Sequence, residues 1–402
     1  MPPVNPVRFG ANYVPSSGWF HSWLDFSADA ARRDFADLAG LGLDHVRVFP
    51  IWPWIQPNRT LIRRRGIDDL LTLIDVAAEF DLSVSVDLLQ GHLSSFDFLP
   101  SWILTHHGRS LFADRQVRRG IAAYAAALSA AVAEKPNVFA ITLGNEVNNL
   151  WPANGTTPEI SREWAAELIG TVREHAPRLL ALHSLYDATW YDPGHPFHPA
   201  DNTDLGDLTT VHSWVFNGVS AVDGPLGPAT VTHADYLVEL AAATSADPAR
   251  MVWLQEVGAP RPDIGADEAA PFTRALLECV GSNPALYGVT WWCSHDLDRS
   301  LADFPGREYD LGLFTVGHEA KPAAKELAAY IASARRTAGQ GPRPALVCDV
   351  DLRTQPERRG EVAPGSDFHS EWVRLRQAGP VAIVPAARAA DLDHLRARGV
   401  RR

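Results

Sequence analysis

The stretch Ile141–Leu150 reads ITLGNEVNNL. It begins as an apolar run of β-forming residues and then places Asn145 and Glu146 directly after a glycine. A buried strand has no structural need for an acid at its end. This stretch therefore indicates a functional site, provided that a second carboxylate lies at the end of a comparable strand.

Other short apolar runs along the chain have the same β-strand character, and amphipathic stretches with a helical period separate most of them. The expected strands are Val7–Val14, Leu43–Phe49, Ser83–Leu89, Val138–Leu143, Leu180–Leu185, Leu208–Val215, Met251–Gln255 and Tyr287–Trp292. The first expected helix begins after Ser27, a good N-cap residue, and stops at Gly42.

Strands that alternate with helices in this way predict an α/β fold, the (β/α)8 TIM barrel. A doubly wound open sheet is the alternative fold. It is disfavoured because no glycine-rich phosphate loop follows the first expected strand.

The composition changes near residue 337, where TAGQGPRP is typical of a linker. We expect a catalytic barrel over residues 1–336. Residues 337–402 should comprise the linker and a small C-terminal α/β appendage, with short strands and a helix in ALVCDVDL and GPVAIVPAARAADLDHLRARGV. Because this segment is too small for an independent hydrophobic core, we expect it to dock on the barrel.

The composition limits the partners and the compartment. The chain has 402 residues and a net charge of −12, which argues against nucleic acid or an anionic membrane surface as the main partner. No apolar run is long enough to cross a bilayer. The cysteines lack metal-ligand spacing and are expected to be free thiols, and the N-terminal residues do not resemble a secretory signal. We therefore expect a cytoplasmic protein. The sequence indicates no metal or organic cofactor and does not indicate an oligomeric state.

Two carboxylates follow expected strands. Catalytic residues of such barrels lie at the C-terminal ends of the strands. Glu146 ends the fourth expected strand, and Glu256 ends the seventh in MVWLQEVGAP. Two carboxylates facing one pocket suit glycoside hydrolysis, in which one protonates the leaving oxygen and the other attacks the anomeric carbon or activates water. A single strand-end Glu more often caps a helix or pairs with Arg, but two of them favour catalysis.

LGNEVN and WLQEVGAP resemble motifs of the clan A retaining glycoside hydrolases, most closely those of glycoside hydrolase family 5, and the resemblance covers roughly residues 6–336. By this resemblance Glu146 is the general acid/base, Glu256 is the nucleophile, and Asn145 binds the 2-hydroxyl of the sugar. The acid has to be protonated and the nucleophile ionised. We therefore expect apolar walls or a negative charge near Glu146 and hydrogen-bond donors near Glu256.

Three further residues match or depart from the family pattern around the nucleophile. Arg47 lies between two valines of the second expected strand, where an inward guanidinium needs a carboxylate, and the resemblance makes it the donor to Glu256. His212 matches the strand-six histidine of the family. The family usually has Tyr two residues later, whereas this chain has Trp214. Either the indole N–H of Trp214 or another residue contacts the nucleophile.

The resemblance also implies sugar-binding residues. Trp292, in YGVTWWCSHD, fits the aromatic platform beneath the reacting sugar, and Trp291 should point into the core because side chains alternate along a strand. The family tends to have His two residues after an Asp on strand three, but this chain has Leu89 there. His92, further along in VDLLQGHLSSFDF, is the expected sugar ligand instead.

Several loops resemble those of a narrower group, the exo-acting β-mannosidases of actinobacteria, which release mannose from the Man-β-1,4-GlcNAc core of N-glycans. The matching stretches are NYVPSSGWFHSWLD, VRVFPIWPWIQPNRT, QGHLSSFDFLPSW, HSWVFNG and TWWCSHD. This resemblance implies an oligosaccharide substrate and a pocket closed at one end by the loops Ser16–Trp23 and Leu93–Trp102. The alternatives are an endo-β-mannanase or endo-glucanase with an open cleft, a β-glucosidase, and a non-catalytic sugar-binding protein.

Overall fold

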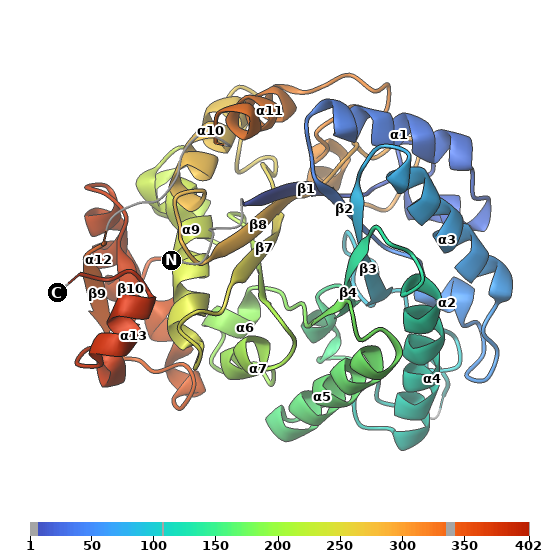
Figure 1. The fold of residues 1–402 in the computed structure, drawn as a ribbon, viewed down its shortest axis with the longest axis horizontal. Helices are drawn as coiled ribbons and strands as arrows, with labels where there is room; N and C mark the ends of the chain where they lie inside the picture. The colour runs from blue at the N-terminus through green and yellow to red at the C-terminus, as the bar shows by residue number, and fades with distance from the viewer. Residues whose placement is uncertain (1–6, 107, 335–341, 402) are drawn as a thin grey trace.

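The computed structural model describes residues 7–106, 108–334 and 342–401, and parallel strands form its centre (Figure 1). These strands are β1 (Arg8–Asn12), β2 (His45–Val48), β3 (Ser83–Leu89), β4 (Val138–Gly144), β5 (Leu180–Leu182), β6 (Thr209–Ser213), β7 (Val252–Val257) and β8 (Leu286–Trp291). They pair in the order β5-β4-β3-β2-β1-β8-β7-β6, and every pair is parallel. The (β/α)8 TIM barrel predicted from the sequence is confirmed.

The barrel closes between β5 and β6 through individual hydrogen bonds. The backbone N–H of Asp207 donates to the carbonyl of Ala181 at 2.9 Å, and the Asp207 carboxylate accepts from the Ala181 N–H at 2.7 Å. Further along the same pair of strands, the Thr210 hydroxyl donates to the carbonyl of His183 at 2.7 Å. Strand β5 ends at Leu182, three residues earlier than predicted, because beyond it the backbone bonds to a side chain rather than to a ladder partner.

Helices surround the strands (Figure 1). The longer ones are α1 (Ala28–Gly40), α3 (Arg64–Ala78), α4 (Arg115–Val132), α5 (Pro158–His175), α9 (Pro228–Thr244), α10 (Ala269–Val280) and α11 (Pro322–Ala334). The shorter ones are α2 (Trp52–Ile55), α6 (Ala188–Tyr191), α7 (Pro199–Asp204) and α8 (Ser220–Asp223). Ser27 caps α1 as predicted, because its hydroxyl accepts from the N–H of Ala30 at 3.3 Å.

The C-terminal segment contains a parallel pair of strands, β9 (Ala345–Cys348) and β10 (Ala382–Pro385), with the helices α12 (Asp367–Arg376) and α13 (Leu392–Ala397). The sequence interpretation allowed a single helix here and missed α12. This helix has a polar composition that hides its period, but its start carries a recognisable cap, since the Ser366 hydroxyl accepts from the N–H of His369. The predicted boundary at residues 336–337 lies outside the described residues.

Buried charges join this segment to α9 of the barrel. Glu239 of α9 is fully buried and pairs with Arg343 and, at 2.8 Å, with Arg398. The hydroxyl of Tyr236, also in α9, donates to the carbonyl of Val362 at 2.6 Å. Helix α9 is buried along nearly its whole length because the barrel lies on one side of it and the C-terminal segment on the other (Figure 1).

Two further expectations concern the whole chain. Cys279, Cys293 and Cys348 are all free, as predicted. Among the described residues, no helix has the length and apolar character needed to cross a membrane.

Candidate active site

The two predicted catalytic carboxylates lie together at the C-terminal end of the barrel. Glu256 belongs to β7, and Glu146 follows β4. One carboxylate oxygen of each and a ring nitrogen of His212 all lie within 4.8 Å of one another. Catalytic carboxyl groups are about 5 to 5.5 Å apart in retaining glycosidases and about 6.5 to 9.5 Å apart in inverting ones. The separation therefore fits a retaining reaction.

The backbone around Glu146 explains how an acid can follow this strand. Gly144 ends β4 so close to β3 that a Cβ atom there would lie 2.4 Å from the carbonyl oxygen of Leu89. The N–H of Asn145 donates to the same carbonyl at 2.9 Å. Glu146 then adopts a left-handed conformation, with φ of 45° and ψ of 41°. Such a conformation in a residue other than glycine costs about 1 to 3 kcal/mol and is concentrated at functional sites.

Arg47 of β2 is completely buried and joins both sides of the site. It donates to Glu256 Oε1 at 2.9 Å, which agrees with the predicted contact. It also binds Asp87 through two nitrogens, at 2.9 and 2.5 Å. It also donates to the side-chain oxygens of Asn145 at 2.7 Å and Asn12 at 3.1 Å. Arg47 therefore fixes the positions of four side chains.

Sequence reasoning missed Asp87 and Asn12. Asp87 is a completely buried acid within the apolar strand β3, so the signal that singled out Arg47 was present for Asp87 too. Asn12 ends β1, and its amide donates to the backbone carbonyl of Gln255 in β7 at 3.0 Å. An amide at a strand end is common, and only the three-dimensional contact distinguishes it.

His212 connects the two carboxylates. It lies beside Glu256 in the β6–β7 pairing. Its Nδ1 is hydrogen-bonded to Glu146 Oε1 at 2.7 Å and lies 3.3 Å from Glu256 Oε2. Its Nε2 contacts Ser184 Oγ at 3.0 Å and Gln255 Oε1 at 3.3 Å. Burial alone would lower the pKa of His212, but the Glu256 and Glu146 carboxylates raise it to about 9. His212 therefore joins the two carboxylates into one hydrogen-bonded group.

The nucleophile position has the predicted donors. The indole N–H of Trp214 donates to Glu256 Oε2 at 3.3 Å, which is the first of the two alternatives left by the sequence. Burial would raise the pKa of Glu256, but the positive charges of His212 and Arg47 outweigh it and hold that pKa below its usual range. Glu256 is therefore ionised near neutral pH.

The two adjacent tryptophans of strand eight face opposite ways, as predicted. Trp291 packs in the main core of the barrel and is 1% exposed. Trp292 belongs instead to a second apolar group, which we call the aromatic cluster, and its ring lies 5.7 Å from that of Phe49. The buried members of this cluster are Val14, Trp19, Phe20, Phe49, Ile51, Leu93, Trp214, Trp292, Cys293, Leu297 and Leu311.

The loops predicted to close the pocket meet in the aromatic cluster. Trp19, from the loop Ser16–Trp23, lies 5.5 Å from the ring of Phe96 and 5.6 Å from that of Phe98. Both phenylalanines belong to the loop Leu93–Trp102. The ring of Phe304, from the segment after β8, is 4.7 Å from Trp19. Three loops at the C-terminal end of the barrel are thus joined by aromatic packing.

The predicted sugar ligands Asn145 and His92 lie side by side. The amide of Asn145 donates to the backbone carbonyl of His92 at 2.7 Å. The ring Nδ1 of His92 contacts Asp97 at 2.8 Å. Burial lowers the pKa of His92, but Asp97, followed by the more distant Glu146, raises it above its usual value overall. The roles of both residues in binding sugar stay predictions.

Polar residues from the segments that follow the strands also lie near Glu146, and sequence reasoning did not identify them. Asn149 donates to Glu146 Oε2 at 3.1 Å, and Asn217 donates to Asp187 at 2.8 Å. Burial raises the pKa values of Asp187 and Glu308 to about 7, and in each case the charge of Glu146 contributes to the shift. These loops have no periodic pattern, so the sequence offered no signal that would have selected these side chains.

Comparisons with known proteins place the chain among solved glycoside hydrolases, although no family model and no curated protein matches it. A GH5_18 structure from Streptomyces cattleya in complex with GlcNAc is 48% identical, with a TM-score of 0.96, over 99% of this chain and 98% of that chain. A glutamate-to-alanine GH5_18 variant from Bifidobacterium longum subsp. longum ATCC 55813, in complex with Manβ1-4GlcNAc, is 39% identical, with a TM-score of 0.94, over 98% and 95% of the two chains. The exo-β-1,4-mannosidase Op5Man5 from Opitutaceae bacterium strain TAV5 is 25% identical, with a TM-score of 0.77, over 94% and 69%.

Proposed function

The chain belongs to the GH5_18 family of glycoside hydrolases, and from this membership we propose that it is a retaining exo-β-mannosidase that releases mannose from Man-β-1,4-GlcNAc. The observation that carries the proposal is the group formed by Glu146, His212 and Glu256 at the C-terminal end of the barrel. Relatives of the same family bind this disaccharide and GlcNAc, its reducing-end half.

The first step of the proposed reaction uses both carboxylates. A carboxylate oxygen of Glu256 attacks the anomeric carbon of the terminal mannosyl unit and forms a covalent ester. The bond from that carbon to O4 of GlcNAc breaks, and the electron pair leaves with the oxygen. Glu146 donates its proton to that oxygen, so GlcNAc departs as a neutral alcohol.

The second step reverses these roles. Glu146, now a carboxylate, takes a proton from a water molecule while the water oxygen attacks the anomeric carbon. The ester bond to Glu256 breaks, and Glu256 regains its negative charge. Two inversions at one carbon leave mannose in the β configuration.

The surrounding residues stabilise the ionised nucleophile and orient it. The contacts from Arg47 and Trp214 hold its two oxygens from different sides, at 2.9 and 3.3 Å. Hydrogen bonds to a charged group are roughly twice as strong as neutral ones. Since Arg47 is itself held by Asp87, the nucleophile is positioned before the substrate binds.

We assign the recognition of mannose to the side of the site that contains Asn145 and His92. A β-mannosyl unit has an axial 2-hydroxyl, whereas its glucosyl epimer has an equatorial one. A site built to bind one hydroxyl discriminates strongly, because the wrong epimer leaves buried polar groups without partners. Trp292 is the proposed platform for the apolar face of the same sugar, and the loops that carry Trp19 and Phe96 close the end of the pocket.

The proposal is tested by comparing aryl β-mannoside, β-glucoside and β-galactoside as substrates. The β-mannoside should exceed the β-glucoside by at least about tenfold in kcat/KM, which corresponds to about 1.4 kcal/mol in transition-state binding. On a mannan chain the enzyme should release mannose alone. Equal rates on the two epimers would contradict the mannosidase assignment, and mixed oligosaccharides would contradict exo action.

A further inference from the structure

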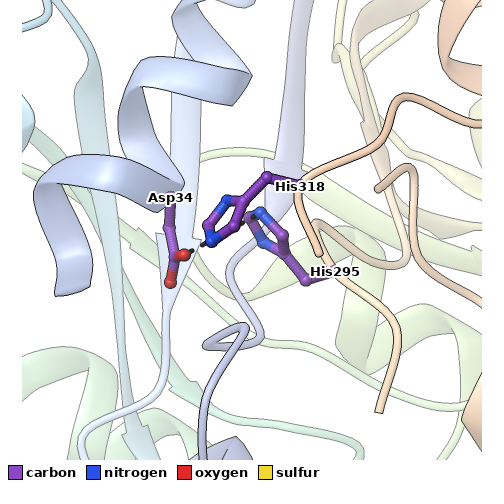
Figure 2. A group of neighbouring side chains, drawn as sticks. All are labelled: Asp34, His295 and His318. Carbon is purple, nitrogen blue, oxygen red and sulfur yellow. Dashed lines mark ion pairs between the residues drawn. The ribbon is translucent and has the colours of Figure 1, made fainter. Parts of the chain in front are cut away.

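A second group of acidic and imidazole side chains lies outside the catalytic group. Asp34 and Asp37 belong to α1, His295 follows β8, and His318 lies in the loop before α11. Figure 2 shows Asp34, His295 and His318. The two histidines extend from the segment between β8 and α11, and the aspartate extends from α1. We call these four residues the Asp/His cluster.

The donor atoms of the cluster converge on one point. One ligand atom from each of Asp34, His295 and His318 lies within 4.8 Å of the others. Nε2 of His295 is 3.9 Å from Asp34 Oδ1 and 3.2 Å from Asp37 Oδ2. Nδ1 of His318 is 2.6 Å from the same Asp37 oxygen. Two imidazole nitrogens and two carboxylate oxygens from three separate segments therefore face one another.

One of these atoms, Asp34 Oδ1, accepts no hydrogen bond from the described residues. Asp34 is completely buried. Its Oδ2 accepts from the Tyr13 hydroxyl at 2.8 Å and from the N–H of Ser16 at 3.2 Å, so the carboxylate is held in a fixed orientation. Its Oδ1 is also buried but has no hydrogen-bond partner among the described residues. A buried, oriented and unpartnered carboxylate oxygen costs free energy unless a ligand binds it.

The two carboxylates of the cluster also lack a permanently charged partner. Within the described part of the chain, neither Asp34 nor Asp37 forms an ion pair with a lysine or arginine, and both contact only histidines among the basic residues. The charge of one divalent cation matches that of two carboxylates. A bound cation would thus supply both the missing partner of Asp34 Oδ1 and a permanent positive charge.

We propose that the Asp/His cluster binds one Zn²⁺ ion through Asp34 Oδ1, Asp37 Oδ2, His295 Nε2 and His318 Nδ1. Imidazole and carboxylate together suit zinc, whereas calcium and magnesium prefer oxygen ligands alone. Bonds of about 2.0 to 2.2 Å in a tetrahedron put neighbouring ligand atoms about 3.3 Å apart. The distances from His295 Nε2 to the two carboxylates, 3.2 and 3.9 Å, are close to this value. The distance of 2.6 Å between His318 Nδ1 and Asp37 Oδ2 is shorter and would lengthen when zinc binds.

A site with four protein ligands is closed, which is typical of structural zinc. It would join α1 to the segment after β8. That segment is attached to the end of β1, since the N–H of Ser294 donates to the carbonyl of Asn12 at 2.9 Å, and its hydroxyl donates to the carbonyl of Val14 at 2.8 Å. Trp292 lies three residues before His295 in the same segment. Zinc is thus proposed to hold the segment that carries the sugar platform, without taking part in the reaction.

The test uses the full chain without an affinity tag. The protein is stripped with a chelator, dialysed against Zn²⁺ and analysed for metal by mass spectrometry. We expect one zinc per chain in the wild type. His318→Ala removes a partly exposed ligand and should keep the fold, yet it should weaken zinc binding by at least about tenfold, since even the loss of an outer partner has that effect. His175→Ala is the matched control, because His175 is part-buried and, among the described residues, its ring nitrogen is hydrogen-bonded to a backbone carbonyl of its own helix.

Two further measurements test zinc binding: thermal stability with Zn²⁺ and visible absorption with Co²⁺. The Tm of the wild type should rise with Zn²⁺ concentration, because a ligand that binds only the folded state stabilises it. The Tm of His318→Ala should not rise over the Zn²⁺ concentrations that stabilise the wild type. With Co²⁺ in place of zinc, the wild type should show the visible absorption of a tetrahedral site, and the variant should lose it. The proposal is overturned if the stripped wild type binds no zinc, or if wild type, His318→Ala and His175→Ala bind it equally.

Discussion

The substitution Trp214→Phe removes one hydrogen-bond donor from the nucleophile and little else. The indole N–H of Trp214 donates to Glu256 Oε2 at 3.3 Å, and its ring stacks on Phe216 with centroids 5.2 Å apart. A phenyl ring keeps most of that packing but cannot donate. The ionised form of Glu256 therefore loses stabilisation, whereas its protonated form is nearly unaffected.

The size of the effect follows from the contact. A hydrogen bond to a charged group contributes about 1.5 to 3 kcal/mol, and the long distance favours the lower end of that range. Since one pKa unit corresponds to about 1.36 kcal/mol, the pKa of Glu256 should rise by about one unit. His212 and Arg47 lower this pKa in the wild type. The indole N–H also favours the ionised carboxylate, so its loss should move the acid limb of kcat/KM toward higher pH.

The assay is the pH profile of kcat/KM on an aryl β-mannoside, because this parameter reports groups in the free enzyme. Trp291→Phe is the matched control: it deletes the same atoms from a tryptophan in the main core. It should lower Tm and leave the acid limb in place. An acid limb that stays in place in Trp214→Phe, or that moves equally in both variants, would refute the role assigned to the indole.

Five other substitutions separate chemistry from stability. Glu256→Ala should abolish turnover of every substrate, whereas Glu146→Ala should spare aryl glycosides with good leaving groups and regain activity with azide; identical behaviour on both substrate types would mean that the roles are misassigned. Trp292→Ala should reduce transition-state binding by about 3 kcal/mol in kcat/KM. Trp291→Ala should instead lower the unfolding free energy by about 3 to 5 kcal/mol, and the reverse pattern would show that the facing is wrong. Glu239→Gln leaves two buried arginines without a countercharge and should cost about 3 kcal/mol in urea unfolding; a loss below about 1 kcal/mol would contradict the ion-pair account.

The strands of the barrel were predictable because each is an apolar run long enough to be buried on both sides. The range Ser83–Leu89 is the same in sequence and structure, and the other strands differ at their ends by one to three residues. The largest error is at β5, where the seam with β6 ends the strand early. Strand ends depend on such partners across the sheet, which a single sequence does not show.

The two carboxylates were predictable because both follow strands, and the rule for barrels then brings them together. Arg47 was predictable as a buried charge in an apolar strand. The bridging position of His212 was not, because it depends on how β6 and β7 pair. The Asp/His cluster was equally hidden: Asp37 and His318 are 281 positions apart, and no local spacing connects them.

The sequence also did not predict that the acidic residues Asp187 and Glu308 lie near the active site. Asp187 follows strand five, and Glu308 lies in a short 3-10 helix (Gly306–Asp310) after strand eight. Many polar residues in such connections are simply solvated. Only the fold shows that burial raises their pKa values to about 7. Sequence patterns identify residues on regular strands, whereas loop residues need the folded structure.

The most direct test of the central claim is the hydrolysis of Man-β-1,4-GlcNAc followed by proton NMR at early times. The mechanism requires two displacements at the anomeric carbon, with Glu256 bound covalently between them. The first mannose released should therefore be the β-anomer, and the α-anomer should appear later by mutarotation. Release of α-mannose first would contradict the retaining mechanism, and an intact disaccharide would contradict the proposed substrate.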